Sequence, residues 1–493
     1  MIKGGIMEEK DLEEIREDVM ETATETGLGA GEELSSQEET HYSWKDELEE
    51  PREETMDERI NRKLEEMRER SGEAGDEQPK QKKLWANKKI KKFDRMRYRE
   101  QKCKEWEVRI VNQGMQDDKL GLYIHIPFCD RKCDYCDFVS YSMGLDAQHE
   151  FKDALFKEIA MYRKQCEKMV FNSIYIGGGT PSVMYEGFIY ELSRQIYSNF
   201  HLEGEIEFTI EVNPNSVNPK KLMEYLQAGV NRVSVGVQCL DSKLLRNVGR
   251  FQTIENIDYT FELLQKMGFI NTSADVMIGL PHQSLDAVKN TIEYLVDHNV
   301  KHISVYTLQV EENTQLYKNI KMGKVKPLGD AACIKMYELV NDMLKKAGFV
   351  RYEVSNFAIP TYESKHNFKY WKDVDYLGLG VSAHSFLEGY RFNNTPRLDE
   401  YIEKINNGEL PVVEKEFIRD SERRTEYIML SLRLATDLNL EKFRKRFKED
   451  LLKTRASQIQ ALIKNGYVFI DEGYLKIAPQ HFYVSNRIIL ELL

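Results

Sequence analysis

Apolar and polar positions follow two alternating rhythms along residues 120–310. Short β-branched runs are each followed by a longer stretch in which apolar residues recur every three or four positions. The short runs predict strands at 122–126, 173–176, 207–212, 232–237, 272–278 and 302–307. The longer stretches predict amphipathic helices at 147–169, 183–199, 218–228, 253–267 and 284–298. Strands that alternate with helices form βαβ units, so we expect parallel pairing and right-handed crossovers.

The number of units predicts the kind of α/β fold. Six units in succession favour a partial or full β/α barrel over a sandwich, and we expect a partial TIM-like (β/α)6-type barrel over 119–394. In such barrels the chemistry sits at the carboxyl ends of the strands. The predicted strands are followed by HIPFCDRKC, GGGTPS, EVNPN, GVQ and GLP. These sequences predict a site ringed by βα loops.

A different pattern begins after residue 394. Helical patterns at 421–434, 440–449 and 456–465 precede GYVFIDEGYLKIAP, which predicts a two-stranded hairpin, and a last helix follows Ser485. This order predicts a winged-helix-like α+β module over 395–493. Such modules often bind DNA, but Lys464 is the only charged residue of 456–465, so no basic recognition face is present. We therefore expect a structural or partner-docking role and no binding of nucleic acid.

Charge is concentrated in the first quarter of the chain. Residues 1–78 carry 27 acidic and 10 basic side chains, and residues 79–109 carry 13 basic and 4 acidic ones. A segment with so few apolar residues cannot offset its ordering entropy, so 1–118 is predicted to be a disordered extension with fragments of helix. The basic stretch 82–99 is interpreted as a solvated linker helix, with contact to RNA or to the acidic arm as alternatives. Met115 is an alternative start of the chain.

The composition of the whole chain excludes several classes of protein. A net charge of −12 argues against nonspecific binding to nucleic acid or anionic lipid. No run of 18 apolar residues is present, so we expect no membrane span. The N-terminus lacks the apolar region of a signal peptide, and we expect a cytoplasmic protein. Seven cysteines are an odd number and sparse for this length, which argues against a disulfide framework.

Three of these cysteines lie within eight residues, in the sequence CDRKCDYC. They are Cys129, Cys133 and Cys136, directly after the first predicted strand. A structural zinc site would require a fourth cysteine or histidine nearby, and the next cysteine, Cys166, lies on a predicted helix. Three thiolates suit an iron–sulfur cluster with one open iron. We favour the cluster, with zinc or plain packing as alternatives.

CxxxCxxC after an N-terminal strand is the signature of the radical S-adenosylmethionine (SAM) superfamily. GLYIHIPFCDRKCDYCDF, YIGGGTPS, EVNPNSV, GVNRVSVGVQ, ADVMIGLP and GLGVSAHSF stand in this order between 121 and 386. With them the chain resembles the oxygen-independent coproporphyrinogen III oxidase-like family over 120–493. The resemblance implies that the three cysteines hold a [4Fe–4S] cluster and that SAM chelates the fourth iron. One electron from the cluster, which an electron donor must supply, then breaks a sulfonium C–S bond and leaves a 5′-deoxyadenosyl radical.

The resemblance also implies a SAM pocket. The glycines after the second predicted strand let the backbone approach a polar ligand, although a simple turn is the alternative. The other implied contacts stand at or near strand ends, with structural hydrogen bonds, or an ion pair between Glu211 and Arg250, as the alternative. The implied SAM site consists of Tyr123, Tyr135, Gly178, Gly179, Thr180, Glu211, Gln238, Arg250 and Asp275. No catalytic residue follows from the resemblance.

Two features indicate a branch of the family. The decarboxylating branch has a further cysteine where this chain has Phe138, and its ordered N-terminal tail has no counterpart in the charged extension. The sequence HNFKYW at 366–371 instead resembles the HNxxYW motif of the haem-chaperone branch, HemW. If this segment is helical, His366 and Tyr370 share one face beside Trp371, and His366 is a candidate axial ligand of haem. The alternative is a hydrogen-bonded histidine in an aromatic cluster at a barrel end.

His384 is a second, weaker candidate ligand, and His125 is interpreted as structural. The leading hypothesis is a chaperone that binds the cluster, SAM and haem and hands haem to an acceptor protein. The alternatives are a coproporphyrinogen III dehydrogenase, which decarboxylates two propionates, and radical methyl or alkyl transfer to another substrate.

Overall fold

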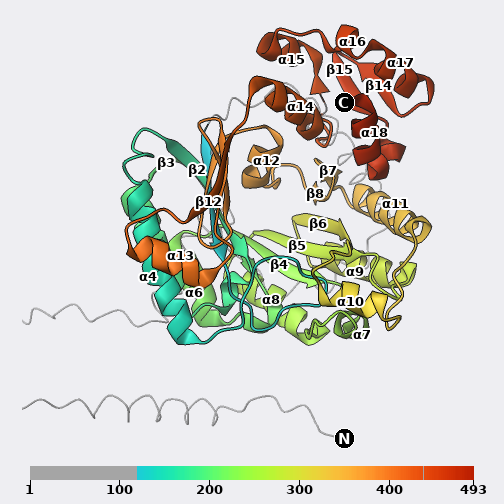
Figure 1. Cartoon of the computed structure of the whole chain (residues 1–493). Helices are drawn as coiled ribbons and strands as arrows, with labels where there is room; N and C mark the ends of the chain where they lie inside the picture. Colours follow the sequence, from blue (N-terminus) through green and yellow to red (C-terminus); the bar gives the residue numbers. More distant parts are fainter. Residues whose placement is uncertain (1–118, 437) are drawn as a thin grey trace, which may run out of the picture. The chain divides into compact units, whose positions relative to one another are not determined.

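The computed structural model describes residues 119–436 and 438–493. The charged extension, the basic stretch and Met115 therefore lie outside the described residues. Six parallel strands stand side by side in the larger sheet (Figure 1). They are β1 (Leu120–Ile126), β2 (Val170–Gly178), β3 (His201–Val212), β4 (Arg232–Gln238), β5 (Asn271–Ile278) and β6 (His302–Thr307). All six predicted strands are confirmed.

Shorter strands extend this sheet at both edges. On one side β9 (Tyr376–Leu379) runs parallel to β1, and β10 (His384–Leu387), β11 (Tyr390–Asn394) and β12 (Val412–Phe417) follow in antiparallel order. On the other side β8 (Asn356–Ala358) and β7 (Val350–Arg351) follow β6. The described sheet begins at β12 and ends at β7, so it is an open, partial barrel, as predicted.

Amphipathic helices connect the parallel strands along the outer side of the barrel (Figure 1). The five predicted ones are present as α4 (Leu145–Tyr162), α5 (Phe188–Asn199), α6 (Pro219–Ala228), α8 (Ile254–Lys266) and α9 (Leu285–Asp297). The remaining connections contain η2 (Pro181–Val183), η3 (Pro214–Ser216), α7 (Ser242–Arg246), α10 (Gln315–Lys321), α11 (Asp330–Lys346), α12 (Lys365–Trp371) and α13 (Leu398–Asn406). Helix starts follow the local sequence: Thr253 and Asn256 form a capping box at α8, and Ser284 caps α9.

The two faces of the parallel strands differ in chemistry. On β1, Leu122, Ile124 and Ile126 are fully buried on the helix-covered face. The alternate residues Tyr123 and His125 project to the inner face. The register continues this inner face across the sheet through Tyr175, Thr209 and Arg232. Buried parallel strands are usually apolar on both faces, so a polar inner wall indicates an interior built for something other than packing.

The C-terminal residues form a module of helices with a three-stranded sheet. Its elements are α14 (Asp420–Ser431), β13 (Leu438–Asn439), α15 (Leu440–Phe447), α16 (Leu451–Thr454), α17 (Ala456–Lys464), β14 (Val468–Asp471), β15 (Tyr474–Ile477), η4 (Pro479–Val484) and α18 (Ser485–Leu492). Leu432, Phe443 and Leu475 are fully buried in its own core. The helices and the hairpin are as predicted. The domain boundary at 394 stays a prediction, and the barrel sheet continues to β12.

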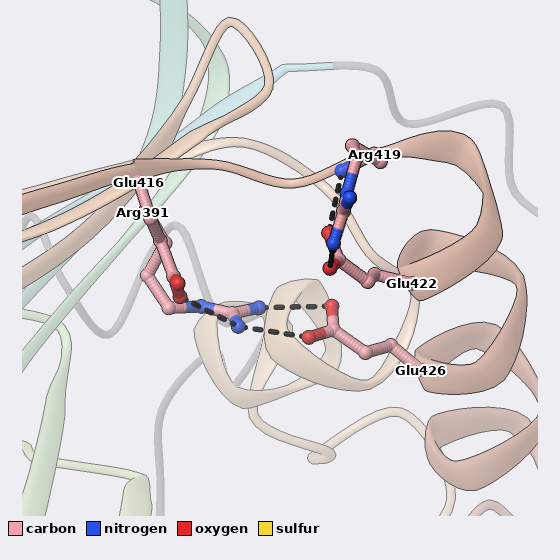
Figure 2. Close-up of polar contacts among 5 residues, drawn as sticks. All are labelled: Arg391, Glu416, Arg419, Glu422 and Glu426. Carbon is pink, nitrogen blue, oxygen red and sulfur yellow. Dashed lines mark hydrogen bonds and ion pairs between the residues drawn. The ribbon is translucent and has the colours of Figure 1, made fainter.

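Ion pairs join this module to the barrel. Figure 2 shows Arg391 of β11 donating to both carboxylate oxygens of Glu426 on α14, at 2.8 and 2.9 Å. Asp373, after α12, accepts from Arg423 of α14 at 3.2 Å and from Arg446 of α15. Because the Asp373 side chain is only 4% exposed, this carboxylate is a buried anchor for two helices.

In the part of the chain that the structure describes, no helix combines the length and the apolar character needed to cross a membrane.

Candidate functional site

The three cysteines lie on the loop that follows β1. Backbone hydrogen bonds fix this loop at both ends: the Cys129 N–H donates to the Tyr141 carbonyl at 3.0 Å, and the Tyr141 N–H donates to the Pro127 carbonyl at 2.8 Å. Between them, the Asp134 N–H donates to Val248 after α7, at 2.9 Å, and its carbonyl accepts from Leu316 of α10, at 2.7 Å. The loop is therefore closed by its own backbone bonds and held by two other segments, one after α7 and one at α10.

The thiols themselves are partly exposed and free of disulfides. The Cys129 sulfur lies 3.3 Å from the Thr180 hydroxyl, and Arg250 Nη1 lies 4.0 Å from the Cys133 sulfur. Burial raises the pKa of Cys129 and of Cys136, so without a metal these two thiols favour the protonated form. Among the described residues, no three His, Cys, Asp or Glu side chains converge on a single metal ion. A cubane cluster offers each cysteine a different iron, so its thiols need not meet at one point.

The glycine-rich loop after β2 is bonded directly to the cysteine loop. The Gly179 N–H donates to Ile126 at 2.8 Å, and the Thr180 N–H donates to Phe128 at 2.7 Å. A Cβ at Gly179 would lie 2.5 Å from the Phe128 carbonyl oxygen, and Gly178 has a φ of +106°. These glycines are therefore required by the close approach of β1 and β2, whatever ligand the loop also receives.

Two carboxyl groups face each other across the inner wall. The Tyr175 hydroxyl donates to Glu211 at 2.7 Å, and the Ser234 hydroxyl donates to both oxygens of Asp275 at 3.3 and 3.4 Å. Burial, and after it the charge of Asp275, raises the pKa of Glu211 to about 7. The Arg232 guanidinium opposes this shift. A cationic ligand bound beside these two carboxyl groups would lower both pKa values and favour their charged forms, so the wall suits such a ligand.

Arg250 and Gln238 belong to the same end of the barrel. Arg250 Nη2 donates to the Gly236 carbonyl, and its Nε donates to Gln252 at 2.8 Å. Glu211 has its contacts with Tyr175 and with the Gly178 backbone, so the two members of the alternative ion pair have other partners. Gln238 has a φ of 62°, where the register of β4 against β5 shifts. A strained residue of this kind persists only where its surroundings hold it.

The two aromatic candidates lie in different surroundings. The Tyr123 hydroxyl lies 3.1 Å from His125 Nδ1, and its ring lies against Tyr175 on the inner wall. His125 Nε2 in turn lies 3.0 Å from the Val139 carbonyl of the cysteine loop, so His125 has the structural role predicted for it. Tyr135 packs on an apolar cluster at the ends of β4 and β5 that includes Cys239 and Leu280. It thus anchors the cysteine loop.

His366 is helical, as expected for HNFKYW, but it lies at the other end of the barrel. A Cβ at Gly121, near the start of β1, would lie 3.0 Å from its ring, whereas the cysteines follow the end of β1. Five residue steps from Gly121 to Ile126 span roughly 16 Å at the usual strand rise. The backbone N–H groups of Lys365 and His366 each donate to the Glu207 carboxylate of β3, both at 2.9 Å. Glu207 therefore caps the N-terminus of α12.

Both ring nitrogens of His366 already have partners. Nδ1 lies 2.9 Å from the Ser173 hydroxyl and Nε2 lies 2.8 Å from the Tyr370 hydroxyl, and the residue is 1% exposed. Burial lowers its pKa to about 3. Trp371 packs on a cluster of Tyr352, Phe368 and Leu434. The geometry of this motif corresponds to the alternative of an aromatic cluster at a barrel end.

His384, in contrast, is exposed. It is the first residue of β10 and pairs with Asn393 of β11. Asn393 in turn pairs with Glu414 of β12. A Cβ at Gly380, between β9 and β10, would clash with the His125 carbonyl oxygen, so the turn that leads to His384 lies against the carboxyl end of β1. His384 therefore lies on the side of the barrel that carries the cysteine loop.

Sequence reasoning missed Tyr175, Arg232 and Gln252. Tyr175 and Arg232 have the same strand parity as Gly177 and Gln238, so strict counting along each strand could have found them. Arg232 is 2% exposed, and its Nε has no hydrogen-bond partner among the described residues. No signal in the sequence distinguishes Gln252 from other glutamines.

Comparison with known proteins identifies two matched segments. Residues 123–295 match the family model of the radical SAM superfamily, and residues 419–483 match that of the HemN C-terminal domain. The chain is 31% identical to the haem chaperone HemW of Lactococcus lactis over 371 residues, which are 75% of this chain and 96% of that protein. It is also 31% identical to HemW of Bacillus subtilis over 367 residues, 74% of this chain and 97% of that one.

Among solved structures, the radical SAM enzyme coproporphyrinogen III oxidase (HemN) of Escherichia coli superposes with a TM-score of 0.69. The match covers 78% of this chain and 92% of that one at 21% identity. At this identity the likeness concerns the fold alone.

Proposed function

This chain belongs to the HemW family of radical SAM proteins, and we propose that it is a haem chaperone that binds a [4Fe–4S] cluster, SAM and haem and passes haem to an acceptor protein. The observation that carries the proposal is the full-length likeness to two HemW proteins, together with the junction of the cysteine loop and the glycine-rich loop. Cys129 and Thr180, 51 residues apart in sequence, meet there at 3.3 Å.

The cysteine loop fits the cluster. Cys129, Cys133 and Cys136 are free, half-exposed thiols on a loop whose backbone is fixed at several points. Metal coordination by thiolate offsets the burial that otherwise raises the pKa of Cys129 and of Cys136. The Thr180 hydroxyl is placed to donate to the Cys129 sulfur, and the Arg250 cation lies beside Cys133. When bound, the cluster and SAM supply one-electron chemistry that opens a carbon–sulfur bond.

The inner wall fits SAM, which carries an ammonium, a sulfonium and a carboxylate. Glu211 and Asp275 supply negative charge for the cationic groups, and Arg250 supplies a positive group at the cysteine loop. Gln238 presents an amide at the end of β4, and Tyr135 presents an aromatic surface. The remaining members, Tyr123, Gly178 and Gly179, shape the wall and the loop around the ligand.

The haem ligand that we propose is His384. An axial ligand needs a ring nitrogen that the iron can reach, and His384 is exposed and follows the turn that lies against the carboxyl end of β1, where the cysteine loop begins. His366 would first have to give up its hydrogen bond with Tyr370 and leave a site where it is 1% exposed. We assign His366, Tyr370 and Trp371 to closing the opposite end of the barrel.

A two-tube experiment tests the function. Anaerobic protein with reconstituted cluster is titrated with haemin in one tube and given coproporphyrinogen and SAM in the other. A shifted Soret band without protoporphyrinogen formation is expected. Stoichiometric decarboxylation would replace the chaperone with the dehydrogenase alternative, which at present has only the fold in its favour.

The cluster is tested with single cysteine variants. Cys129→Ala, Cys133→Ala and Cys136→Ala should each lose the chromophore of the roughly four irons per chain that a cubane cluster contains. Cys166→Ala is the matched control, because Cys166 lies buried after α4, away from the cysteine loop. A chromophore that survives the loss of Cys133 would overturn the assignment.

A further inference from the structure

Two oxygen acceptors fix the Arg250 guanidinium. Nη2 donates to the Gly236 carbonyl at 2.5 Å, and Nε donates to Gln252 Oε1 at 2.8 Å. A guanidinium is planar and rigid, so two acceptors determine the direction of its third nitrogen. That nitrogen, Nη1, faces the Cys133 sulfur at 4.0 Å.

Gln252 uses both ends of its amide in this arrangement. Its Oε1 accepts from Arg250, and its Nε2 donates to the Val237 carbonyl at 2.5 Å. The residue is 2% exposed, whereas the adjacent Phe251 is 52% exposed. A buried amide with both ends bonded has a single orientation, because a flipped amide would place its NH₂ against the Arg250 N–H.

Gln252 also borders the strained end of β4. Its partner Val237 directly precedes Gln238, whose φ is 62°. In the same segment, the carbonyl oxygen of Gly236 accepts a hydrogen bond from Arg250. Arg250 and Gln252 thus bond the carbonyls of two consecutive residues, Gly236 and Val237, and these bonds hold the strained conformation of Gln238.

We propose that Gln252 is a positioning residue: through Arg250 it sets the direction of a cation toward Cys133, and through Val237 it holds Gln238 at the SAM site. The inference rests on the proposed function for the cluster and SAM. Gln252 does not itself touch a cysteine or the inner wall at Glu211 in any described contact.

The test compares Gln252→Leu with Gln265→Leu, an exposed glutamine on α8 that serves as control. Iron content, the midpoint potential of the cluster and SAM affinity are measured anaerobically. In Gln252→Leu we expect full iron content, a more negative potential because the Arg250 cation is no longer directed at Cys133, and roughly tenfold weaker SAM binding. The control should match wild type in all three.

A second variant covers the case in which Gln252→Leu loses its iron. Gln252→Glu keeps the acceptor for Arg250 but replaces the donor to Val237 with a carboxylate oxygen. The added negative charge beside Arg250 makes the potential more negative by itself, so SAM affinity is the readout for this variant, and we expect it to fall. Wild-type potential and SAM affinity in Gln252→Leu, or wild-type SAM affinity in Gln252→Glu, would overturn the inference. Wild-type protein that fails to bind SAM in the same titration would instead refute the proposed function.

Discussion

Nε2 of His366 lies 2.8 Å from the Tyr370 hydroxyl, one helical turn away, and this contact satisfies the nitrogen that a haem iron would require. The same ring stacks on Tyr175 at 5.3 Å between centroids. The motif that most suggested haem binding is therefore part of the polar interior of the barrel.

The first prediction separates the two histidines. His384→Ala should weaken haem binding roughly tenfold or more, because a metal–ligand bond is lost, while the cluster stays intact. His366→Ala should keep the Soret shift but unfold at lower temperature, since Ser173 and Tyr370 lose a buried partner. Haemin titration and thermal melting of both variants check this. A Soret shift lost only in His366→Ala would return the ligand to α12.

Gly179→Ala should disturb the junction of the two loops. The new Cβ would lie 2.5 Å from the Phe128 carbonyl oxygen, which belongs to the backbone and cannot rotate away. We expect iron content after reconstitution to fall by half or more, because the clash displaces the cysteine loop. Gly329→Ala is the matched control, because a Cβ there meets nothing within 4 Å. Equal iron content in both variants would contradict the close approach described here.

Asp373→Asn should loosen the junction between the module and the barrel. Asparagine tolerates the positive φ of 57° at this position, so the change removes charge without adding backbone strain. Arg423 and Arg446 lose their shared carboxylate, and the free energy of unfolding should fall by about 1–3 kcal/mol in urea titration. Asp399→Asn is the control: Asp399 pairs with Arg397 on the surface, where solvent screens the charges, so this change should lower the free energy of unfolding far less. If both variants lose a similar free energy of unfolding, the buried ion pairs of Asp373 contribute no more to stability than an exposed ion pair.

Glu158 should make stability depend on pH. It is fully buried and accepts hydrogen bonds from Tyr401, Asn394 and the Gly380 N–H, and burial raises its pKa to about 7. The folded state therefore binds this proton more tightly than the unfolded state, whose pKa is near 4.5. The resulting stabilisation is full at low pH and is lost as pH rises from about 4.5 to about 7.

The comparison for this prediction is Glu158→Gln, which cannot titrate. Between pH 5.5 and 8 the melting temperature of the variant should rise relative to that of wild type, even if the substitution lowers both values through a lost hydrogen bond. Melting curves at four pH values measure this difference. A difference that does not change with pH would mean that Glu158 has an ordinary pKa.

The parallel half of the fold was predictable because alternation along a strand is a local property. Ile174 and Ile176 bury one face of β2 in register with the other strands, and α6, α8 and α9 each begin at a residue whose side chain caps the helix. The short strands could not be predicted in this way. β9 has four residues and pairs with β1, about 250 positions earlier, so its identity depends on a distant partner.

Those residues of the candidate site could be predicted that lie in loops after the parallel strands. Cys129, Thr180 and Arg250 are brought together because parallel strands place their carboxyl ends at one edge. His366 shows the limit of this reasoning. The spacing of His366 and Tyr370 correctly indicates a shared helix face, but contacts with distant residues, among them Glu207 and Ser173, decide which end of the barrel that face closes.

The open order of the sheet leaves β12 as an edge strand. Five of its six residues are exposed, and its middle carries Glu414, Lys415 and Glu416. An unpaired edge is a template on which another molecule can add a strand, and charged side chains along it make that addition unfavourable. The charges of β12 thus disfavour self-association of the protein through this edge. Replacing all three with threonine should allow β12 of one molecule to pair with an edge strand of another. We expect the variant to form oligomers whose fraction rises with protein concentration.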